Sequence, residues 1–207
     1  MNSTPRPSVS KPSDPLVARV AAVLARDLAP SSDFDLNADR PRLTSDRQAA
    51  VLLPLMPRGE TFHLVLTKRS AHLRAHPGQI ALPGGRLDPG ETHLQAALRE
   101  SHEEIGLDPA GVEILGTLPG HSTVTGFEVT PFVGIIPADT SLDAMTAEVA
   151  EVFTVPLAQV LDPASFRIEG RVWNGLQRRY FTVPVGPWYI WGATARILKQ
   201  LADGVAR

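Results

Sequence analysis

The chain has 207 residues, of which 43% are hydrophobic and 20% charged, a balance typical of one soluble domain with a single core. Its formal net charge of −2 provides no overall positive field that would attract nucleic acid or an anionic membrane, so we expect neither as a partner. The sequence contains no cysteine, which excludes disulfides, thiolate zinc sites and cysteine nucleophiles.

The N-terminal region carries no signal for export or membrane insertion. Residues 1–14 are rich in Ser and Pro and lack the apolar stretch of a signal peptide, so they predict a disordered tail. Residues 16–28 have apolar side chains at helical spacing, but they are too short and too charged to span a bilayer. We therefore expect a cytoplasmic protein. Residues 30–42 predict a linker loop, so residues 15–42 form an expected helix and linker ahead of a domain at residues 43–207.

The rest of the chain alternates between strand and helix patterns. A stretch rich in Gly, Pro and His at residues 70–90 precedes the clearest helix, and the order of elements favours an α/β fold with a mixed sheet between helices. Strands are predicted at residues 49–53, 62–67, 112–118, 128–136 and 148–156, a hairpin at 166–172 and 178–183, and helices at 92–105 and 188–202, with a helical turn at 157–161.

Three glutamates on the helix at residues 92–105 suggest a metal site. Glu100, Glu103 and Glu104 have the spacing i, i+3 and i+4, which places them on one helix face. Three like charges there repel one another and require a cation, and carboxylate oxygens suit Mg²⁺ or Mn²⁺ rather than zinc. For a Glu-Glu pair alone, a solvent-exposed helix face would be the better interpretation. The surrounding residues change that balance.

The pattern runs from Gly85 through five residues to Glu91, through seven residues to Arg99-Glu100, and through two residues to Glu103-Glu104. Together with Gly106 it resembles the Nudix box, with Ser101 where the pattern prefers a bulkier aliphatic residue. The resemblance implies an α/β/α sandwich with a mixed sheet, in which the box forms a loop, a helix and a loop. It also implies a hydrolase that cuts a nucleoside diphosphate linked to another group.

By the same resemblance, Glu100 and Glu104 are the best candidates for metal ligands, followed by Glu103, and Gly85 would offer its backbone carbonyl. Arg99 and Glu91 would pair and brace the helix. The base that deprotonates the attacking water varies in this family, so it stays open between Glu103, Glu148 and Glu151. The residues expected to serve catalysis are therefore Glu100, Glu103, Glu148 and Glu151.

A second motif precedes the box and carries a local basic patch. It comprises residues 66–70, Arg74, Gly78 and residues 82–85, and it resembles the motif of the coenzyme A pyrophosphatase branch, with Leu82 where the branch usually has Phe. The resemblance extends over roughly residues 48–201. It implies cleavage of coenzyme A into 4′-phosphopantetheine and 3′-phospho-AMP. We expect Arg69 and Arg74 to face phosphate groups, and Lys68 and Leu82 to contact the substrate.

Two other functions stay open. The same chemistry would suit an ADP-sugar, a dinucleotide or an oxidised nucleotide, and the second motif favours coenzyme A over these. Some domains of this fold bind ligands without catalysis, but such domains usually lose the box glutamates, and this chain keeps all of them. A homodimer also stays open, because the N-terminal helix and the tryptophan-bearing C-terminal segment could supply apolar surface.

Overall fold

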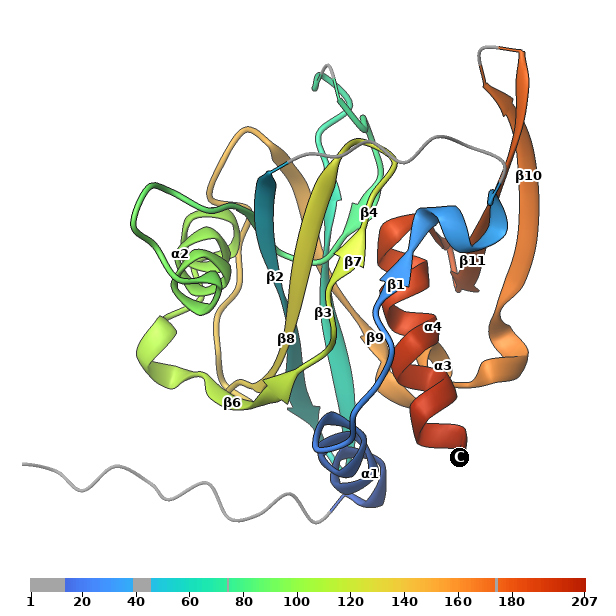
Figure 1. Ribbon diagram of the computed structural model, residues 1–207. Helices are drawn as coiled ribbons and strands as arrows, with labels where there is room; N and C mark the ends of the chain where they lie inside the picture. The colour runs from blue at the N-terminus through green and yellow to red at the C-terminus, as the bar shows by residue number, and fades with distance from the viewer. Residues whose placement is uncertain (1–13, 39–45, 74, 174) are drawn as a thin grey trace, which may run out of the picture.

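The computed structural model describes residues 14–38, 46–73, 75–173 and 175–207. Residues 1–13 of the tail predicted at residues 1–14, residues 39–42 of the predicted linker loop, and Arg74 therefore lie outside the described residues. In the described part, the main sheet has nine strands and mixes parallel with antiparallel pairs (Figure 1). Its principal order is β1 (Ser31–Ser32), β7 (His121–Ser122), β8 (Phe127–Ile135), β2 (Arg47–Arg58), β3 (Thr61–Arg69) and β4 (Ile80–Ala81). Three further strands pair at its sides: β5 (Gly84–Arg86) with β2, β6 (Glu113–Thr117) with β8, and β9 (Val149–Pro156) with β3.

Helices cover both faces of this sheet. Helix α2 (His93–Ile105) lies on one side, while α1 (Pro15–Leu24), α3 (Leu157–Val160) and α4 (Ala193–Ala206) lie on the other (Figure 1). Beyond α4, a second sheet contains β10 (Arg167–Trp173), β11 (Leu176–Val185) and β12 (Trp188–Trp191). Short 3₁₀ helices occupy Asp33–Leu36, Pro109–Gly111 and Pro163–Ser165.

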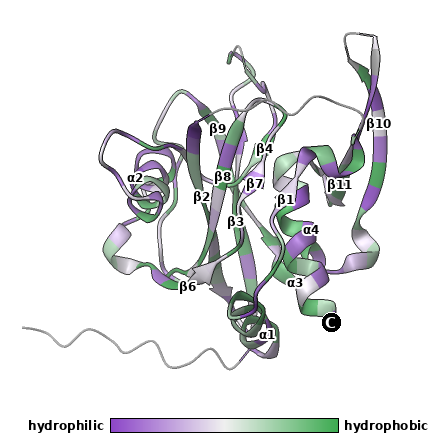
Figure 2. Cartoon of the chain, in the orientation of Figure 1, coloured by the Kyte–Doolittle hydropathy of each residue, from purple (hydrophilic) through white to green (hydrophobic). Residues whose placement is uncertain are grey.

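The alternation of side chains along β2 explains the two cores. Ala50 and Leu52 point to the α2 side, whereas Leu53 and Leu55 point to the α1 and α4 side. Hydrophobic residues accordingly follow the central strands and alternate with hydrophilic ones along α2 (Figure 2). The α/β/α sandwich with a mixed sheet is therefore confirmed. In the described part of the chain, no helix combines the length and apolar character needed to cross a membrane.

The predicted C-terminal helix at residues 188–202 is wrong at its start. Trp188–Trp191 is strand β12, which pairs with β11 across a turn that begins after Val185, with Gly186 at φ 54°. Aromatic and β-branched side chains favour that strand. Gly192, at φ 69°, then separates the strand from α4, which begins at Ala193 and continues to Ala206. The helix is thus displaced toward the C-terminus.

The N-terminal predictions also need correction. The helix predicted at residues 16–28 ends at Leu24, and the predicted loop at residues 30–42 contains β1 and a 3₁₀ helix. Strand β1 forms because it pairs in parallel with β7, far away in the sequence. The apolar face of α1 is covered within the chain, where Val17, Val20 and Val23 are buried. That face is therefore not available to a homodimer. Strand β2 is longer than predicted, since it continues through Pro54 and Pro57 to Arg58.

Candidate functional site

A cavity of about 660 Å³ lies at one end of the main sheet, with α2 on one side and α4 on the other. Its floor is formed by the side chains of Ala49, Val51 and Val129 from β2 and β8. Residues from eight other segments complete the wall: Asp33; Arg69; His76, Gln79, Ala81 and Leu82; Gly84, Gly85 and Arg86; Glu100 and Glu104; Thr123, Val124, Thr125 and Phe127; Glu148; and Ala193, Thr194 and Ile197.

Local sequence signals fix the helix that carries the glutamates. Thr92 caps α2 in a capping box, because its side chain accepts from Gln95 N while Gln95 Oε1 accepts from Thr92 N at 2.9 Å. Gly106 ends the helix in the left-handed conformation at φ 71°. Ser101, the departure from the box pattern, is buried and donates its hydroxyl to the Ala97 carbonyl at 2.6 Å.

Glu104 is the most deeply buried of the box glutamates, with 8% of its surface exposed. Its Oε2 accepts a hydrogen bond from Gly84 N at 3.1 Å. Burial raises the pKa of Glu104 to about 7, and the nearby charge of Glu100 adds to the rise, although the Gly84 N–H opposes it. The charged Glu104 carboxylate therefore has too few cationic or hydrogen-bond-donating neighbours to replace the water that burial removes.

Glu100 lies against the backbone of Gly85. A Cβ atom at residue 85 would fall 2.5 Å from the Glu100 Cδ and Oε1 atoms, so the carboxylate occupies the space that the glycine leaves open. Partial burial raises the pKa of Glu100, and the Arg99 guanidinium opposes that rise. The Gly84-Gly85 segment thus contacts both α2 carboxylates that line the cavity. Gly84 N donates to Glu104, and Gly85 leaves room for Glu100.

Arg99 connects four acidic or carbonyl groups around the box. It donates two hydrogen bonds to the Glu91 carboxylate, at 2.9 and 3.1 Å, and one each to Glu100 at 3.0 Å and Glu103 at 3.2 Å. It also donates to the Arg86 carbonyl at 3.0 Å. The hydrogen bond to Glu91 is the main cause that raises the pKa of Arg99, and the same bond lowers the pKa of Glu91. Arg99 therefore ties the loop before α2 to the helix.

Three of the described residues predicted to serve catalysis, metal binding or substrate binding do not line the cavity. The Glu103 side chain is 52% exposed and turns to Arg99. Glu151 and Lys68 are cross-strand partners in β9 and β3, outside the lining. In the parts of the chain that the structure describes, no three His, Asp or Glu side chains gather closely enough to hold a metal ion. Arg99 supplies the positive charge for two of the box glutamates, Glu100 and Glu103. The three like-charged carboxylates therefore do not converge on one point.

The residues present nevertheless fit a hard divalent cation. Glu100 and Glu104 share one cavity wall with the Gly84-Gly85 backbone, and both have raised pKa values because they are partly or fully withdrawn from water. Carboxylate and carbonyl oxygens are the ligands such a cation prefers. A positive charge at this wall would compensate the buried carboxylate of Glu104.

The second motif contributes the cationic part of the cavity. Arg69 lines it and lies with Nη2 3.5 Å from Glu148 Oε2. The Arg69 Nε atom is buried and has no hydrogen-bond partner among the described residues. Leu82 is buried and lines the same cavity, as does His76, whose φ of 55° is unusual for a residue other than glycine. Of the predicted substrate-binding residues, the structure brings Arg69 and Leu82 together.

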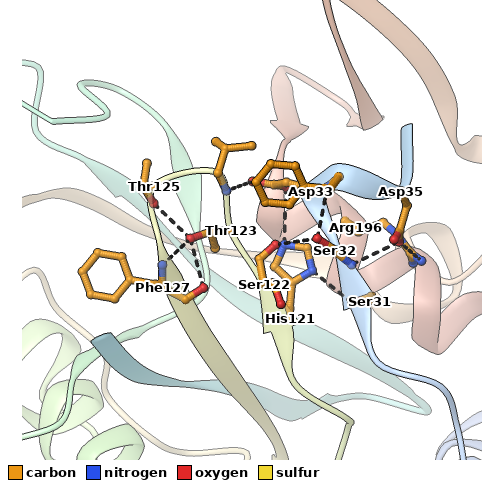
Figure 3. Close-up of polar contacts among 12 residues, drawn as sticks. Ser31, Ser32, Asp33, Asp35, His121, Ser122, Thr123, Thr125, Phe127 and Arg196 are labelled. Carbon is orange, nitrogen blue, oxygen red and sulfur yellow. Dashed lines mark hydrogen bonds and ion pairs between the residues drawn. The ribbon is translucent and has the colours of Figure 1, made fainter. Parts of the chain in front are cut away.

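The cavity wall opposite α2 contains a buried polar cluster that the sequence did not indicate (Figure 3). Asp33 Oδ1 lies 3.4 Å from Nε2 of the fully buried His121, whose Nδ1 is 3.0 Å from Ser31 Oγ. Asp33 Oδ2 accepts from Val124 N at 3.1 Å and lies 3.5 Å from Arg178 Nη2. Burial acts to raise the pKa of Asp33, but these partners together lower it.

This cluster holds the turn that follows β7 in place. Within the turn, Thr123 Oγ1 lies 3.0 Å from Thr125 Oγ1 and accepts from Phe127 N at 2.9 Å (Figure 3). The partners come from segments that are distant in the sequence, so no local spacing could have revealed them. Only the parallel pairing of β1 with β7 brings Asp33 beside His121.

Comparisons with known proteins agree with this architecture. The model of the NUDIX domain matches residues 46–173. A protein from Enterobacter sp. (strain 638), named "Uncharacterized Nudix hydrolase NudL", is 46% identical over 176 residues that span 79% of this chain and 87% of that protein. A protein of the same name from Escherichia coli O7:K1 is 45% identical over 165 residues, spanning 75% and 81%.

A solved structure shows the same fold. The crystal structure of a MutT/nudix family protein from Enterococcus faecalis matches 81% of this chain and 64% of that chain, with a TM-score of 0.50 and 16% sequence identity. At that identity the likeness concerns the fold alone. The domain match and the NudL relatives, together with the box glutamates at the cavity, establish the family. The chain belongs to the Nudix family, and it is a pyrophosphohydrolase that acts on a nucleoside diphosphate derivative.

Proposed function

We propose that this Nudix hydrolase cleaves the diphosphate of coenzyme A, or of its derivatives, into 4′-phosphopantetheine and 3′-phospho-AMP. The observation that carries the proposal is the meeting of two motifs in one cavity. Arg69 and Leu82 of the second motif line the same space as Glu100 and Glu104 of the Nudix box. The second motif resembles that of the coenzyme A pyrophosphatase branch, and this resemblance supports coenzyme A as the substrate.

Nudix hydrolases generally use divalent metal ions, and here Glu100, Glu104 and the Gly85 carbonyl would hold Mg²⁺ or Mn²⁺, joined by Glu103 when it leaves Arg99. The ion, when bound, supplies positive charge that offsets the charge of the diphosphate. Arg99 orients the first carboxylate through its 3.0 Å contact with Glu100. The Gly84 N–H does the same for Glu104. These contacts limit the movement of both side chains before the substrate arrives.

The remaining groups position the substrate and move the proton. Arg69 would pair with a diphosphate oxygen, because it lines the cavity and, among the described residues, its guanidinium forms a single ion pair, at 3.5 Å with Glu148. Among the three candidates for the base, Glu148 is the one that lines the cavity. Glu148 would accept the proton of a water molecule as the water oxygen attacks phosphorus and the bridging phosphorus–oxygen bond breaks. Glu103 and Glu151 lie outside that space in this arrangement.

The proposal is tested by assaying the purified chain with Mg²⁺ or Mn²⁺ on coenzyme A, NADH and ADP-ribose, and by identifying the products. We expect coenzyme A to have the highest kcat/KM and to yield 4′-phosphopantetheine and 3′-phospho-AMP. A Glu104→Gln variant should lose nearly all turnover and stay folded. Glu60→Gln, which makes the same change in the exposed turn between β2 and β3, serves as the control.

Three outcomes would contradict the proposal. Efficient hydrolysis of NADH or ADP-ribose with little cleavage of coenzyme A would reject the substrate while keeping the chemistry. Wild-type turnover in Glu104→Gln would reject the assignment of the box carboxylates. Lack of any metal-stimulated hydrolysis would favour a binding module, although the chain retains every glutamate of the box.

A further inference from the structure

Two arginines flank an aromatic ring at the rim of the cavity. The Cζ atom of Arg47 lies 4.2 Å from the centroid of the Phe127 ring, and that of Arg86 lies 4.9 Å from it. Both distances are within the range of cation–π contacts. Phe127 and Arg86 line the cavity, whereas both arginines are exposed to solvent. We call Arg47, Phe127 and Arg86 the arginine–phenylalanine cluster.

The main sheet fixes the position of this cluster. Arg47 of β2 is the parallel partner of Phe127 in β8, and Ala49 of β2 is the antiparallel partner of Arg86 in β5. Alternation along β2 puts Arg47 on the same face as Ala49 and Val51, which form the cavity floor. The cluster therefore continues the floor toward the end of the sheet, and its place is set by backbone pairing.

Neighbouring groups hold the cluster in shape. Arg47 Nη2 donates to the Thr125 carbonyl, in the same turn that the Thr123 hydroxyl fixes through Phe127 N (Figure 3). The Arg86 carbonyl accepts from Arg99 Nη2 at 3.0 Å, which joins this strand to the Nudix box. Phe127 thus has a fixed place, and both guanidinium groups lie over its ring.

Arg86 contributes a positive charge to the cavity. Among the described residues, no acidic side chain lies within ion-pair distance of the Arg86 guanidinium. An anion that enters the cavity beside Arg86 would offset that charge. The planar fork of the Arg86 guanidinium matches the oxygens of a phosphate.

We propose that the arginine–phenylalanine cluster is a second anion site, which binds a phosphomonoester of the substrate apart from the diphosphate bound near Arg69 and Glu100. This rests on the proposed function, because coenzyme A carries a 3′-phosphate on its ribose in addition to the diphosphate. Both sites belong to one cavity, since Arg86, Arg69 and Glu100 all line it. A substrate with both groups would be held at two points, and the cluster would select it over diphosphates that lack the monoester.

The first experiment compares coenzyme A with dephospho-coenzyme A, which lacks only the 3′-phosphate. We expect the wild-type kcat/KM for coenzyme A to be at least about tenfold higher than for dephospho-coenzyme A. That is the effect expected when a substrate lacks the phosphate that would accept a hydrogen bond from a charged group. Arg86→Gln and Arg47→Gln should each reduce that ratio toward one. Arg58→Gln removes the same charge at the other end of β2 and should leave the ratio unchanged. An unchanged ratio in both cluster variants would overturn the proposal.

The second experiment measures binding without turnover, so it separates this proposal from the choice of coenzyme A as substrate. Titration calorimetry with adenosine 3′,5′-bisphosphate and with AMP should show tighter binding of the bisphosphate, and Arg86→Gln should abolish the difference. If coenzyme A is not hydrolysed but this difference exists and disappears in the variant, the anion site stands and the substrate is wrong. Equal binding of the two nucleotides by the wild type would reject the site whether or not the variants fold.

Discussion

Replacement of Gly85 by alanine tests whether the position of the Glu100 carboxylate controls activity. The new Cβ would lie 2.5 Å from the Glu100 Cδ and Oε1 atoms and 2.8 Å from Oε2. Gly85 is not among the glycines with positive φ, so alanine introduces no backbone strain there. The atoms in conflict belong to the end of a flexible side chain, which can move. The substitution is therefore expected to displace a carboxylate while the fold is retained.

The size of the effect follows from this geometry. The carboxylate must retreat by about 1 Å to regain an ordinary van der Waals separation. A displacement of about that size at a catalytic group can lower the rate roughly 100-fold, which corresponds to about 2.7 kcal/mol in activation free energy. The free energy of unfolding should stay within about 1 kcal/mol of wild type, because replacing glycine in an ordinary backbone conformation costs little.

Three measurements on Gly85→Ala check this expectation: kcat/KM for the diphosphate substrate, Mn²⁺ affinity by calorimetry, and unfolding in urea. Gly84→Ala provides the contrast. Its Cβ would lie 2.3 Å from the Ala50 carbonyl oxygen, and Gly84 has φ 145°, so that variant should lose stability as well as activity. Wild-type kcat/KM together with wild-type Mn²⁺ affinity in Gly85→Ala would refute the reasoning. Activity and metal binding would then not depend on the position of the Glu100 carboxylate.

Two further predictions concern buried charges. In the metal-free protein, Glu104 has a pKa of about 7, against 4.5 in the unfolded chain. Between these two pH values the folded state keeps the Glu104 carboxyl protonated while the unfolded chain loses that proton. The free energy of unfolding should therefore fall by roughly 3 kcal/mol as the pH rises from 4.5 to about 7. Urea unfolding at about pH 5 and pH 8 should show this fall in the wild type and not in Glu104→Gln; equal pH dependence in both would contradict it. Asp33→Asn should lower the free energy of unfolding at neutral pH by about 3 kcal/mol, because Val124 N and Arg178 lose a charged partner. The Asp33 pKa lies below 3.8, so its contribution is present above that pH and is lost as the pH falls through the lowered pKa; a variant as stable as the wild type at pH 7 would rule this out.

The parts of the fold that could be predicted have local causes. Helix α2 begins after Thr92 and ends before Gly106, as the capping residues indicate, and the glutamates project from it at the expected spacing. The cross-strand arrangement of β10 and β11 likewise follows from two extended runs around a turn. In each case the residues that determine the structure lie within a few positions of one another.

The parts that were missed depend on distant partners. Trp188–Trp191 has apolar side chains compatible with a helix as well as with a strand, and pairing with β11 decides for the strand. Ser31 and Asp33 lie in a polar segment that predicts a loop, yet His121 and β7 give that segment a partner. Glu103 shares the helix face of Glu100, but Arg99 lies four residues before it and draws its carboxylate aside. Spacing along one helix specifies which side chains are neighbours, and the surrounding charges decide where they point.

The last described helix has a consequence for biosynthesis. Ala193, Thr194 and Ile197 of α4 form part of the cavity wall, and α4 packs on α1, where Gly204 lies against Val23. A ribosome delivers α1 and the glutamate helix long before it releases α4. A nascent chain therefore carries the box carboxylates before the pocket around them is closed, and the cavity is complete only once α4 has packed into place.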